Sequence, residues 1–268
     1  MTRIETHAFE TLRIERHGDV VEVTIDHPRS ELNAVDGLLH EELTRLFGML
    51  RDETLARAVL LTGSKRAFCA GGDFAWFPEL QGGLAKLDPL RHDAKQLIWD
   101  LLDVEIPIVA ALNGPAVGLG ASIALLCDVI WMADTASIAD PHVRVGIVAG
   151  DGGAAIWPLV LGPARAKEFL LTGDKVEAAD ALRMGLVNRV VPAAELMQQA
   201  RAFAERLAAG APLALRYTKM AVNKWVKQAA SVAFDYSTAL EIVTFQSDDH
   251  REALAAIREK RKPVFKGR

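Results

Sequence analysis

The sequence predicts an α/β fold that gives way to a region made only of helices. Up to about residue 191, short runs rich in β-branched residues alternate with stretches whose apolar residues recur at helical spacing, a pattern typical of α/β proteins. From residue 193 onward only helical patterns remain. We therefore expect a core over residues 1–195 and a helical C-terminal region over residues 196–268.

Five segments have the composition of β-strands. Residues 20–25 read Val-Val-Glu-Val-Thr-Ile, and this enrichment in β-branched residues favours an extended chain. Residues 58–63 form a short apolar run that ends at a glycine. The remaining predicted strands cover residues 107–112, 129–133 and 188–191.

Helices are predicted between and after these strands. Leucines and a phenylalanine recur at helical spacing between residues 38 and 50, so residues 36–52 should form an amphipathic helix. Pro163 suits the first turn of a helical block over residues 162–185. Residues 81–83, Gln-Gly-Gly, are typical of a mobile loop. The other predicted helices cover residues 88–103, 120–127, 193–209, 212–229, 231–246 and 248–261.

The bulk composition excludes several classes of partner. A formal net charge of −4 gives no reason to expect nucleic acid. Residues 1–19 are charged and lack the apolar segment of a signal peptide. The apolar stretch 106–133 is interrupted by Asn113-Gly114-Pro115 and by Asp128, which favours a buried strand, turn and helix over a membrane span. We therefore expect a cytoplasmic protein that binds neither nucleic acid nor membranes.

Two glycine-rich segments carry the most chemical information. One is Phe-Cys-Ala-Gly-Gly-Asp at residues 68–73, and the other is Asn-Gly-Pro-Ala-Val-Gly-Leu-Gly at residues 113–120. Glycine tolerates tight bends and close approach, so each segment can present backbone N–H groups. Two such groups that converge on one oxygen atom form an oxyanion hole, which is usually the largest single stabilising contribution in acyl-transfer and enolate chemistry.

In this order and spacing, the two segments resemble those of the crotonase (enoyl-CoA hydratase/isomerase) superfamily, and the resemblance covers nearly the whole chain. It implies a spiral of repeated ββα units, followed by C-terminal helices that pack homotrimers, often paired into hexamers. It also implies an acyl-CoA thioester as substrate. The amides of Ala70 and Leu119 would form the oxyanion hole, with Gly71 and Gly118 binding substrate beside them. The resemblance implies no metal, and no cofactor beyond the coenzyme A of the substrate.

By the same resemblance, a further group of residues would contact coenzyme A. A loop near residue 30 would flank the adenine and pantetheine, and basic residues, one of them from a neighbouring subunit, would meet the phosphates. These residues are Arg29, Leu32, Ala34 and Lys262, with Lys266 as an alternative to Lys262. A solvated helix face explains the basic tail, residues 251–268, equally well.

The chain departs from the hydratase pattern at both catalytic glutamates. The first glutamate position falls on Ser122 and the second on His142. A serine without a partner base cannot transfer protons near neutral pH, so Ser122 is expected to be a small polar residue that lines the substrate site. An imidazole titrates at about pH 6.5, which suits general-base catalysis by His142.

Nine residues after His142, Asp151 stands in a Gly-Asp-Gly-Gly turn. A neighbouring carboxylate fixes the tautomer of a histidine, so His142 and Asp151 are predicted to form a catalytic dyad. An interface histidine and a turn aspartate would give the same sequence, so their contact stays open. Residues 141–162 are also similar to 6-oxocamphor hydrolases, divergent crotonases that cleave a carbon–carbon bond of a cyclic β-diketone with a His–Asp pair. Those enzymes lack the intact Cys-Ala-Gly-Gly-Asp motif and carry an additional histidine that is missing here.

Trp76, with Phe74 and Phe77, follows the first glycine segment and is predicted to line an apolar acyl pocket, although ordinary core packing would look the same. Three functions remain open. The first is a crotonase-type enzyme that acts on an acyl-CoA through an enolate. The second is hydrolytic (retro-Claisen) cleavage of a β-diketone or β-ketoacyl-CoA. The third is a catalytically silent binding protein, which the loss of both glutamates keeps open.

Overall fold

The computed structural model describes residue 4 and residues 7–268, and it confirms the α/β class. Its strands are β1 (Leu12–His17), β2 (Val20–Ile25), β3 (Ala58–Gly63), β4 (Ile108–Leu112), β5 (Ala116–Val117), β6 (Val129–Ala133), β7 (Ser137–Ala139), β8 (Val176–Glu177) and β9 (Arg189–Val191). A six-stranded sheet has the order β1-β2-β3-β4-β6-β9, and a three-stranded sheet has the order β5-β7-β8. Within the larger sheet every neighbouring pair is parallel except β1 with β2.

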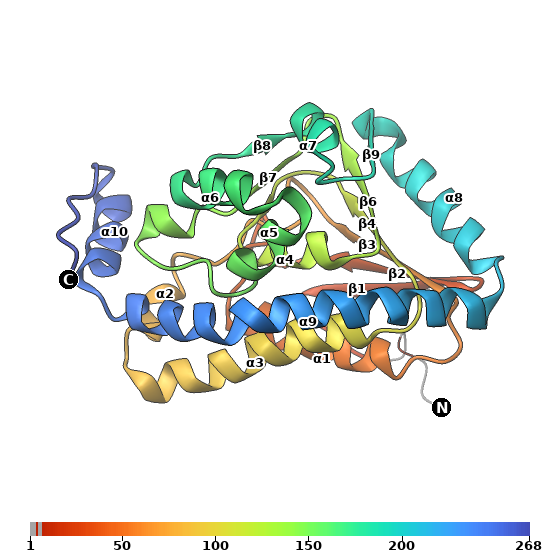
Figure 1. The fold of residues 1–268 in the computed structure, drawn as a ribbon, viewed down its shortest axis with the longest axis horizontal. Coiled ribbons are helices and arrows are strands. Elements are labelled where there is room, and N and C mark those ends of the chain that lie inside the picture. The colour runs from red at the N-terminus through yellow and green to blue at the C-terminus, as the bar shows by residue number, and fades with distance from the viewer. Residues whose placement is uncertain (1–3, 5–6) are drawn as a thin grey trace.

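The helices are α1 (Gly37–Arg51), α2 (Phe77–Leu80), α3 (Leu84–Asp103), α4 (Leu119–Leu126), α5 (Gly153–Leu161), α6 (Pro163–Thr172), α7 (Ala178–Met184), α8 (Leu196–Ala208), α9 (Pro212–Phe245) and α10 (Asp248–Glu259), with two 3-10 helices, η2 (His142–Val145) and η3 (Ala193–Glu195). α8 packs against β2, β3, β4 and β6. α9 runs along the length of the molecule beside α3, which packs on α1 (Figure 1). α10 and the C-terminus lie at the end of the molecule away from α8 (Figure 1).

Successive segments of the chain add strands to the two sheets in turn. β4, β5 and α4 follow one another, and β6, β7 and then α5 repeat this order. β4 pairs with β6 and β5 with β7, both in parallel, so each unit stacks on the one before. This arrangement is the spiral of ββα units that the resemblance to crotonases implies.

Most of the predicted elements are confirmed within a residue or two. The strands predicted at 20–25, 58–63 and 129–133 coincide with β2, β3 and β6. The helix predicted at 36–52 is α1, which begins after Asp36 because the side chain of Asp36 accepts a hydrogen bond from the Leu39 amide at 2.9 Å.

Two helix predictions were wrong. The block over 162–185 is not one helix, because Gly173 takes φ +67° and ends α6, and β8 follows before α7 begins. Conversely, the helices predicted at 212–229 and 231–246 are one helix, α9, of 34 residues. The sequence between them, Ala-Ala-Ser, contains no glycine or proline that would end a helix.

The apolar stretch 106–133 is folded into the core as β4, β5, α4 and β6, as expected. Within residue 4 and residues 7–268, no helix is both long and apolar enough to cross a membrane. The prediction that no signal peptide occupies residues 1–19 falls partly on residues 1–3 and 5–6, which lie outside the described residues.

The predicted boundary between core and C-terminal region falls where η3 ends at Glu195 and α8 begins at Leu196. α8 nevertheless packs on the larger sheet, and only from α9 onward do the helices leave it. The division into two regions and the predicted trimer or hexamer stay predictions, since one chain is described.

Candidate active site

The two glycine-rich segments lie against each other. Cys69 and Ala116 form a parallel bridge, and the Val117 amide donates a hydrogen bond to the Cys69 carbonyl at 2.9 Å. This approach requires glycine at position 71, which has φ +77°, because a Cβ there would lie 2.8 Å from the Val117 carbonyl oxygen. The motifs therefore bring two bent backbone segments to one place.

The amide predicted for the oxyanion hole at Ala70 is already bonded. It donates to the Leu32 carbonyl at 3.0 Å, and the Asp73 amide donates to the Val35 carbonyl at 2.8 Å. Between them, the Gly72 amide has no acceptor in the described part of the chain. The bridge between Val35 and Gly72 uses the groups on either side of Gly72 and leaves its amide free. The assignment of Ala70 is therefore wrong, and Gly72 takes its place as the candidate donor.

The Leu119 amide is a suitable second donor. Leu119 is the first residue of α4, and the first N–H groups of a helix have no partner within it. No residue among those described accepts a bond from this amide. The preceding Gly118 takes φ +54°. The N-terminus of α4 also favours negative charge at this point.

Asn33 holds the first segment in position. It is fully buried with φ +51°, its Oδ1 accepts from the His27 amide at 3.0 Å, and its Nδ2 donates to the Ala67 carbonyl at 3.0 Å. Its neighbour Leu32 supplies the carbonyl that binds the Ala70 amide. Sequence reasoning did not single out Asn33.

A cavity opens beside both candidate amides, and Gly72 and Leu119 line it together with His142. Its other walls are mainly apolar and come from α1, α2, α3 and α9. Trp76 lines the cavity, and its ring lies 6.1 Å from that of His40, centroid to centroid; its predicted role in binding an acyl group stays a prediction. A second, adjoining cavity is lined by Gly71 and Gly118 and shares Gly72 and His142 with the first, so these glycines border the same space.

His142, in η2, lies among three carboxyl groups. Its Nδ1 is hydrogen-bonded to Asp140, and its Nε2 lies 3.4 Å from Asp151 Oδ2 and 3.9 Å from Glu241 Oε1. A Cβ on Gly118 would lie 3.3 Å from His142 Cε1, so the ring adjoins the second glycine segment. The structure brings His142 and Asp151 together, but the carboxylate that orients the ring through Nδ1 is Asp140.

The protonation states of this cluster depend on one another. Burial alone would lower the pKa of His142, but the carboxylate of Asp140 and then that of Asp151 raise this pKa well above its ordinary value. Burial, and then the charge of Asp151, raise the pKa of Glu241 well above its ordinary value. Compared with isolated groups, the cluster therefore favours the protonated forms of the His142 imidazole and of the Glu241 carboxyl group.

Ser122 does not lie on the cavity wall. It is fully buried in α4, and its Oγ lies 3.4 Å from Asp151 Oδ1. A Cβ on Gly152 would lie 2.8 Å from that Oγ, which leaves no room for substrate between them. The prediction that Ser122 lines the substrate site is wrong, because the residue lies behind Asp151 and contacts its carboxylate instead.

Sequence reasoning missed Asp140 and Glu241. Asp140 directly follows β7 and is fully buried, and a polar residue at the end of a buried strand was the available signal. Glu241 lies 99 residues after His142, in the last turns of a long helix, where a lone glutamate is ordinarily solvated. The Thr238 hydroxyl, one turn earlier, donates to the Gly150 carbonyl at 2.9 Å and so fixes α9 to the loop that carries Asp151.

The residues predicted to contact coenzyme A lie at the surface or within local hydrogen bonds. Arg29 pairs with Asp36, with Nη2 and Oδ2 3.0 Å apart, while Leu32 is exposed. The Ala34 amide donates to Ser30 Oγ at 2.9 Å. Lys262 lies in the exposed tail after α10. Their contact with phosphate or adenine stays a prediction.

Asp140, His142 and Asp151 also have the spacing of metal ligands, with ligand atoms within 4.8 Å of one another. A metal ion would need a neutral imidazole, whereas the carboxylates favour the protonated form of His142. The donor set therefore fits a proton-transfer cluster better than a cation site.

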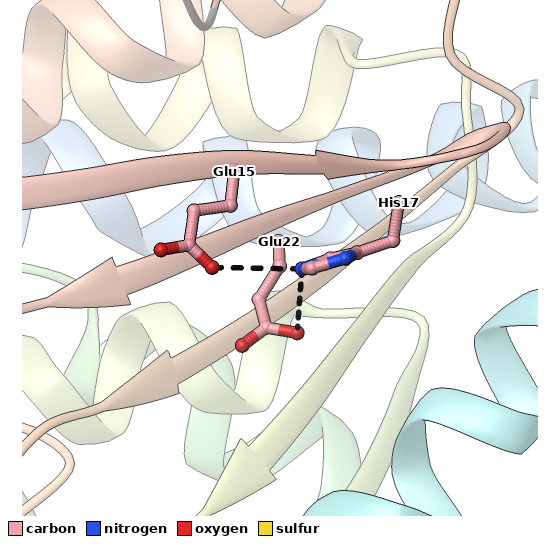
Figure 2. Close-up of side chains that lie close together, drawn as sticks. All are labelled: Glu15, His17 and Glu22. Carbon is pink, nitrogen blue, oxygen red and sulfur yellow. Dashed lines mark ion pairs between the residues drawn. The ribbon is translucent and has the colours of Figure 1, made fainter.

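A second group with such spacing lies on the hairpin of β1 and β2 (Figure 2). His17 Nε2 is 3.6 Å from Glu15 Oε2 and 3.8 Å from Glu22 Oε2. Arg201 of α8 donates to the same Glu22 oxygen at 2.6 Å, so a cationic side chain already pairs with this carboxylate. We therefore interpret the group as surface ion pairing.

Comparison with known proteins gives a consistent result. Residues 15–268 match the sequence model of the enoyl-CoA hydratase/isomerase family. A probable enoyl-CoA hydratase of Mycobacterium tuberculosis is 35% identical over 257 residues, which are 96% of this chain and 98% of that protein.

Two solved structures are also similar. An enoyl-CoA hydratase/isomerase from Mycobacterium paratuberculosis superimposes with a TM-score of 0.88 at 36% identity, over 92% of this chain and 98% of the other. A β-diketone hydrolase from the cyanobacterium Anabaena, bound to (S)-3-oxocyclohexyl acetic acid, superimposes with a TM-score of 0.83 at 32% identity, over 89% and 95% of the two chains.

Proposed function

This chain belongs to the enoyl-CoA hydratase/isomerase family and has its crotonase fold, and we propose that it adds water to, or moves a proton within, an acyl-CoA thioester through an enolate. The observation that carries the proposal is that two free amides, Gly72 and Leu119, line one cavity with His142. The thioester oxygen would accept hydrogen bonds from both amides, and these bonds strengthen as negative charge develops on it. Coenzyme A would enter as part of the substrate, with no other cofactor.

His142 and the neighbouring carboxyl groups of Asp151 and Glu241 would replace the two missing glutamates. In the hydration of a 2-enoyl-CoA, the Asp151 carboxylate accepts a proton from water as the water oxygen bonds to C3. The electron pair of the double bond moves to the thioester oxygen in the oxyanion hole. The enolate then collapses, and C2 takes a proton from the protonated His142 imidazole or from a protonated Glu241 carboxyl group, the forms that the cluster favours. Asp140 holds the imidazole in place through Nδ1.

A second candidate function is hydrolytic cleavage of a β-dicarbonyl compound. The likeness to the β-diketone hydrolase and the Asp140-oriented imidazole both favour it. Water attacks one carbonyl, the bond between the carbonyl carbon and the α-carbon breaks, and a carboxylic acid and an enolate result. The enolate oxygen would occupy the same oxyanion hole, and the α-carbon would take its proton from the same cluster. The two functions therefore differ in the carbon that water attacks.

The test is mass spectrometry of products from a panel of 2-enoyl-CoA thioesters, β-ketoacyl-CoA thioesters and cyclic β-diketones. A 3-hydroxyacyl-CoA from the first class supports the proposal, and chain scission or ring opening to a carboxylate supports the second function. We expect His142→Ala and Asp151→Asn to abolish turnover while the substrate still binds. Asp100→Asn, which alters a buried carboxylate bonded to Arg51, is the matched control and should remain active. No product with any substrate would contradict both functions and favour a silent binding protein.

The finer statements about the assembly and its place in the cell are also proposals. A homotrimer or hexamer would bring the tail with Lys262 near a neighbouring substrate site, and a cytoplasmic location would suit a coenzyme A substrate. Sedimentation of the purified protein tests the first statement, and cell fractionation tests the second.

A further inference from the structure

His40 is a buried polar side chain without a partner in the candidate site. It lies in α1, is 5% exposed and lines the cavity next to Trp76. Its backbone is used by the helix, with its amide donating to the Asp36 carbonyl and its carbonyl accepting from the Thr44 hydroxyl. Within the described part of the chain, neither ring nitrogen has a hydrogen-bond partner. The mechanism above does not use His40.

The His40 ring nitrogens are not among the fully buried unpaired polar atoms of the described residues, so they are accessible from the cavity that His40 lines. A polar side chain that has no protein partner and is accessible from a cavity can bind a ligand there. Burial lowers the pKa of His40, against the opposing charges of Asp93 and Asp151, so the imidazole is neutral. A neutral imidazole offers one N–H donor and one nitrogen acceptor. Such a group can bind a carbonyl or a hydroxyl oxygen.

The rest of the cavity wall defines what kind of atom can reach His40. Leu87, Leu90 and Phe245 are apolar and offer no hydrogen bond to an oxygen. Arg91 also lines the cavity, but its Nε and Nη2 donate to Asp88 Oδ1 at 3.1 and 2.7 Å. The described cavity wall therefore offers no unpaired positive charge to an anionic group. The atom that binds His40 is then a neutral oxygen on an otherwise apolar acyl group.

We propose that His40 binds a carbonyl or hydroxyl oxygen in the acyl portion of the substrate, in addition to the thioester carbonyl held by Gly72 and Leu119. This inference rests on the proposed function, because it assumes that the cavity receives the acyl group. It identifies the substrate class as oxygenated acyl groups rather than plain fatty acyl chains. A plain fatty acyl chain would cover His40 without offering it a hydrogen bond. Such a complex is disfavoured, because it leaves a buried polar group unpaired.

The experiment is isothermal titration calorimetry of the full-length protein with hexanoyl-CoA and with 4-oxo- and 5-oxohexanoyl-CoA. None of these has a double bond to hydrate or a β-carbonyl to cleave, so they report binding alone. We expect at least one oxo compound to bind roughly 10- to 100-fold more tightly than hexanoyl-CoA. His40→Leu should abolish that ratio, and His40→Gln, which keeps a donor and an acceptor, should restore part of it. Glu41→Gln, at an exposed position of the same helix and outside this cavity, should leave the ratio unchanged.

The outcomes separate this inference from the function on which it rests. If hexanoyl-CoA binds and neither oxo compound binds more tightly, the inference is wrong while the acyl-CoA function stands. If an oxo compound is preferred but His40→Leu, folded by thermal melting, keeps the preference, His40 is not the group that binds the oxygen. If none of the three thioesters binds, the acyl-CoA function and the inference both fail.

Discussion

Asp140→Asn tests the orientation of the catalytic imidazole more directly than removal of the imidazole itself. Asp140 is fully buried, one of its oxygens bonds to His142 Nδ1, and the other has no partner among the described residues. A Cβ on Gly153 would lie 1.9 Å from Asp140 Oδ2, so only a side chain of the same shape fits. Asparagine keeps that shape, removes the negative charge and replaces one oxygen with an NH2 group, while its remaining oxygen can still accept a hydrogen bond from His142 Nδ1.

The expected magnitude follows from the charge that is lost. Two unit charges about 4 Å apart interact by about 4 kcal/mol at an effective dielectric constant of about 20. If the protonated imidazole loses that stabilisation, the protonated fraction of His142, and with it kcat, falls by up to about 10³, since each 1.4 kcal/mol is about a factor of ten in an equilibrium. We therefore expect kcat to fall by roughly 10² to 10³, with KM changed by less than about threefold, because Asp140 does not line the cavity.

The assay is the dependence of kcat/KM on pH for both proteins. The carboxylates raise the pKa of His142, so removal of one must lower it, and the limb of the profile that reports His142 should move to lower pH. Asp100→Asn removes a buried carboxylate outside the site and should leave the profile unchanged. An Asp140→Asn enzyme with wild-type kcat and an unshifted profile would refute the reasoning.

Three further predictions concern the same cluster and the glycine segments. The pKa of Glu241 is raised in the folded protein, so folded Glu241 keeps a proton that the unfolded chain releases above the ordinary pKa of 4.5. The stability of the protein therefore falls as the pH rises from 4.5 through the folded pKa. In Glu241→Gln, the melting temperature should fall less steeply over this pH range. Ser122→Ala should lower kcat by less than about tenfold, since the bond from Ser122 to Asp151 is long at 3.4 Å, and a larger loss would contradict its supporting role. Gly71→Ala should lower kcat by about 10² or more, because its Cβ would lie 2.8 Å from the Val117 carbonyl and separate the two segments; unchanged kcat would show that their contact is dispensable.

The fold was largely predictable because its elements are local. The β-branched composition of β2 and the leucine spacing of α1 predict these two elements, and Asp36 predicts the start of α1. The short strand β5 was missed because two residues carry no periodicity, and it forms by tertiary pairing with β7 and with Cys69. Two predicted helices form the single helix α9. Its continuity was hard to predict, because it depends on the absence of a glycine or proline between the two segments and not on a pattern that joins them.

The site residues that lie within one sequence motif could be predicted, because the motif specifies both their places in the fold and their chemical groups. The site residues that the fold brings together from distant parts of the chain could not. His142 and Asp151 share one loop, and the glycine segments have recognisable spacing. Which amide stays free depends on the bridge from Val35 to Gly72, a tertiary contact that a sequence motif does not specify. Glu241 reaches the cluster only because α9 crosses the loop of His142, where burial raises the pKa of its carboxyl group. A glutamate therefore still lies beside the position of the missing second glutamate, but a different helix, α9, supplies it.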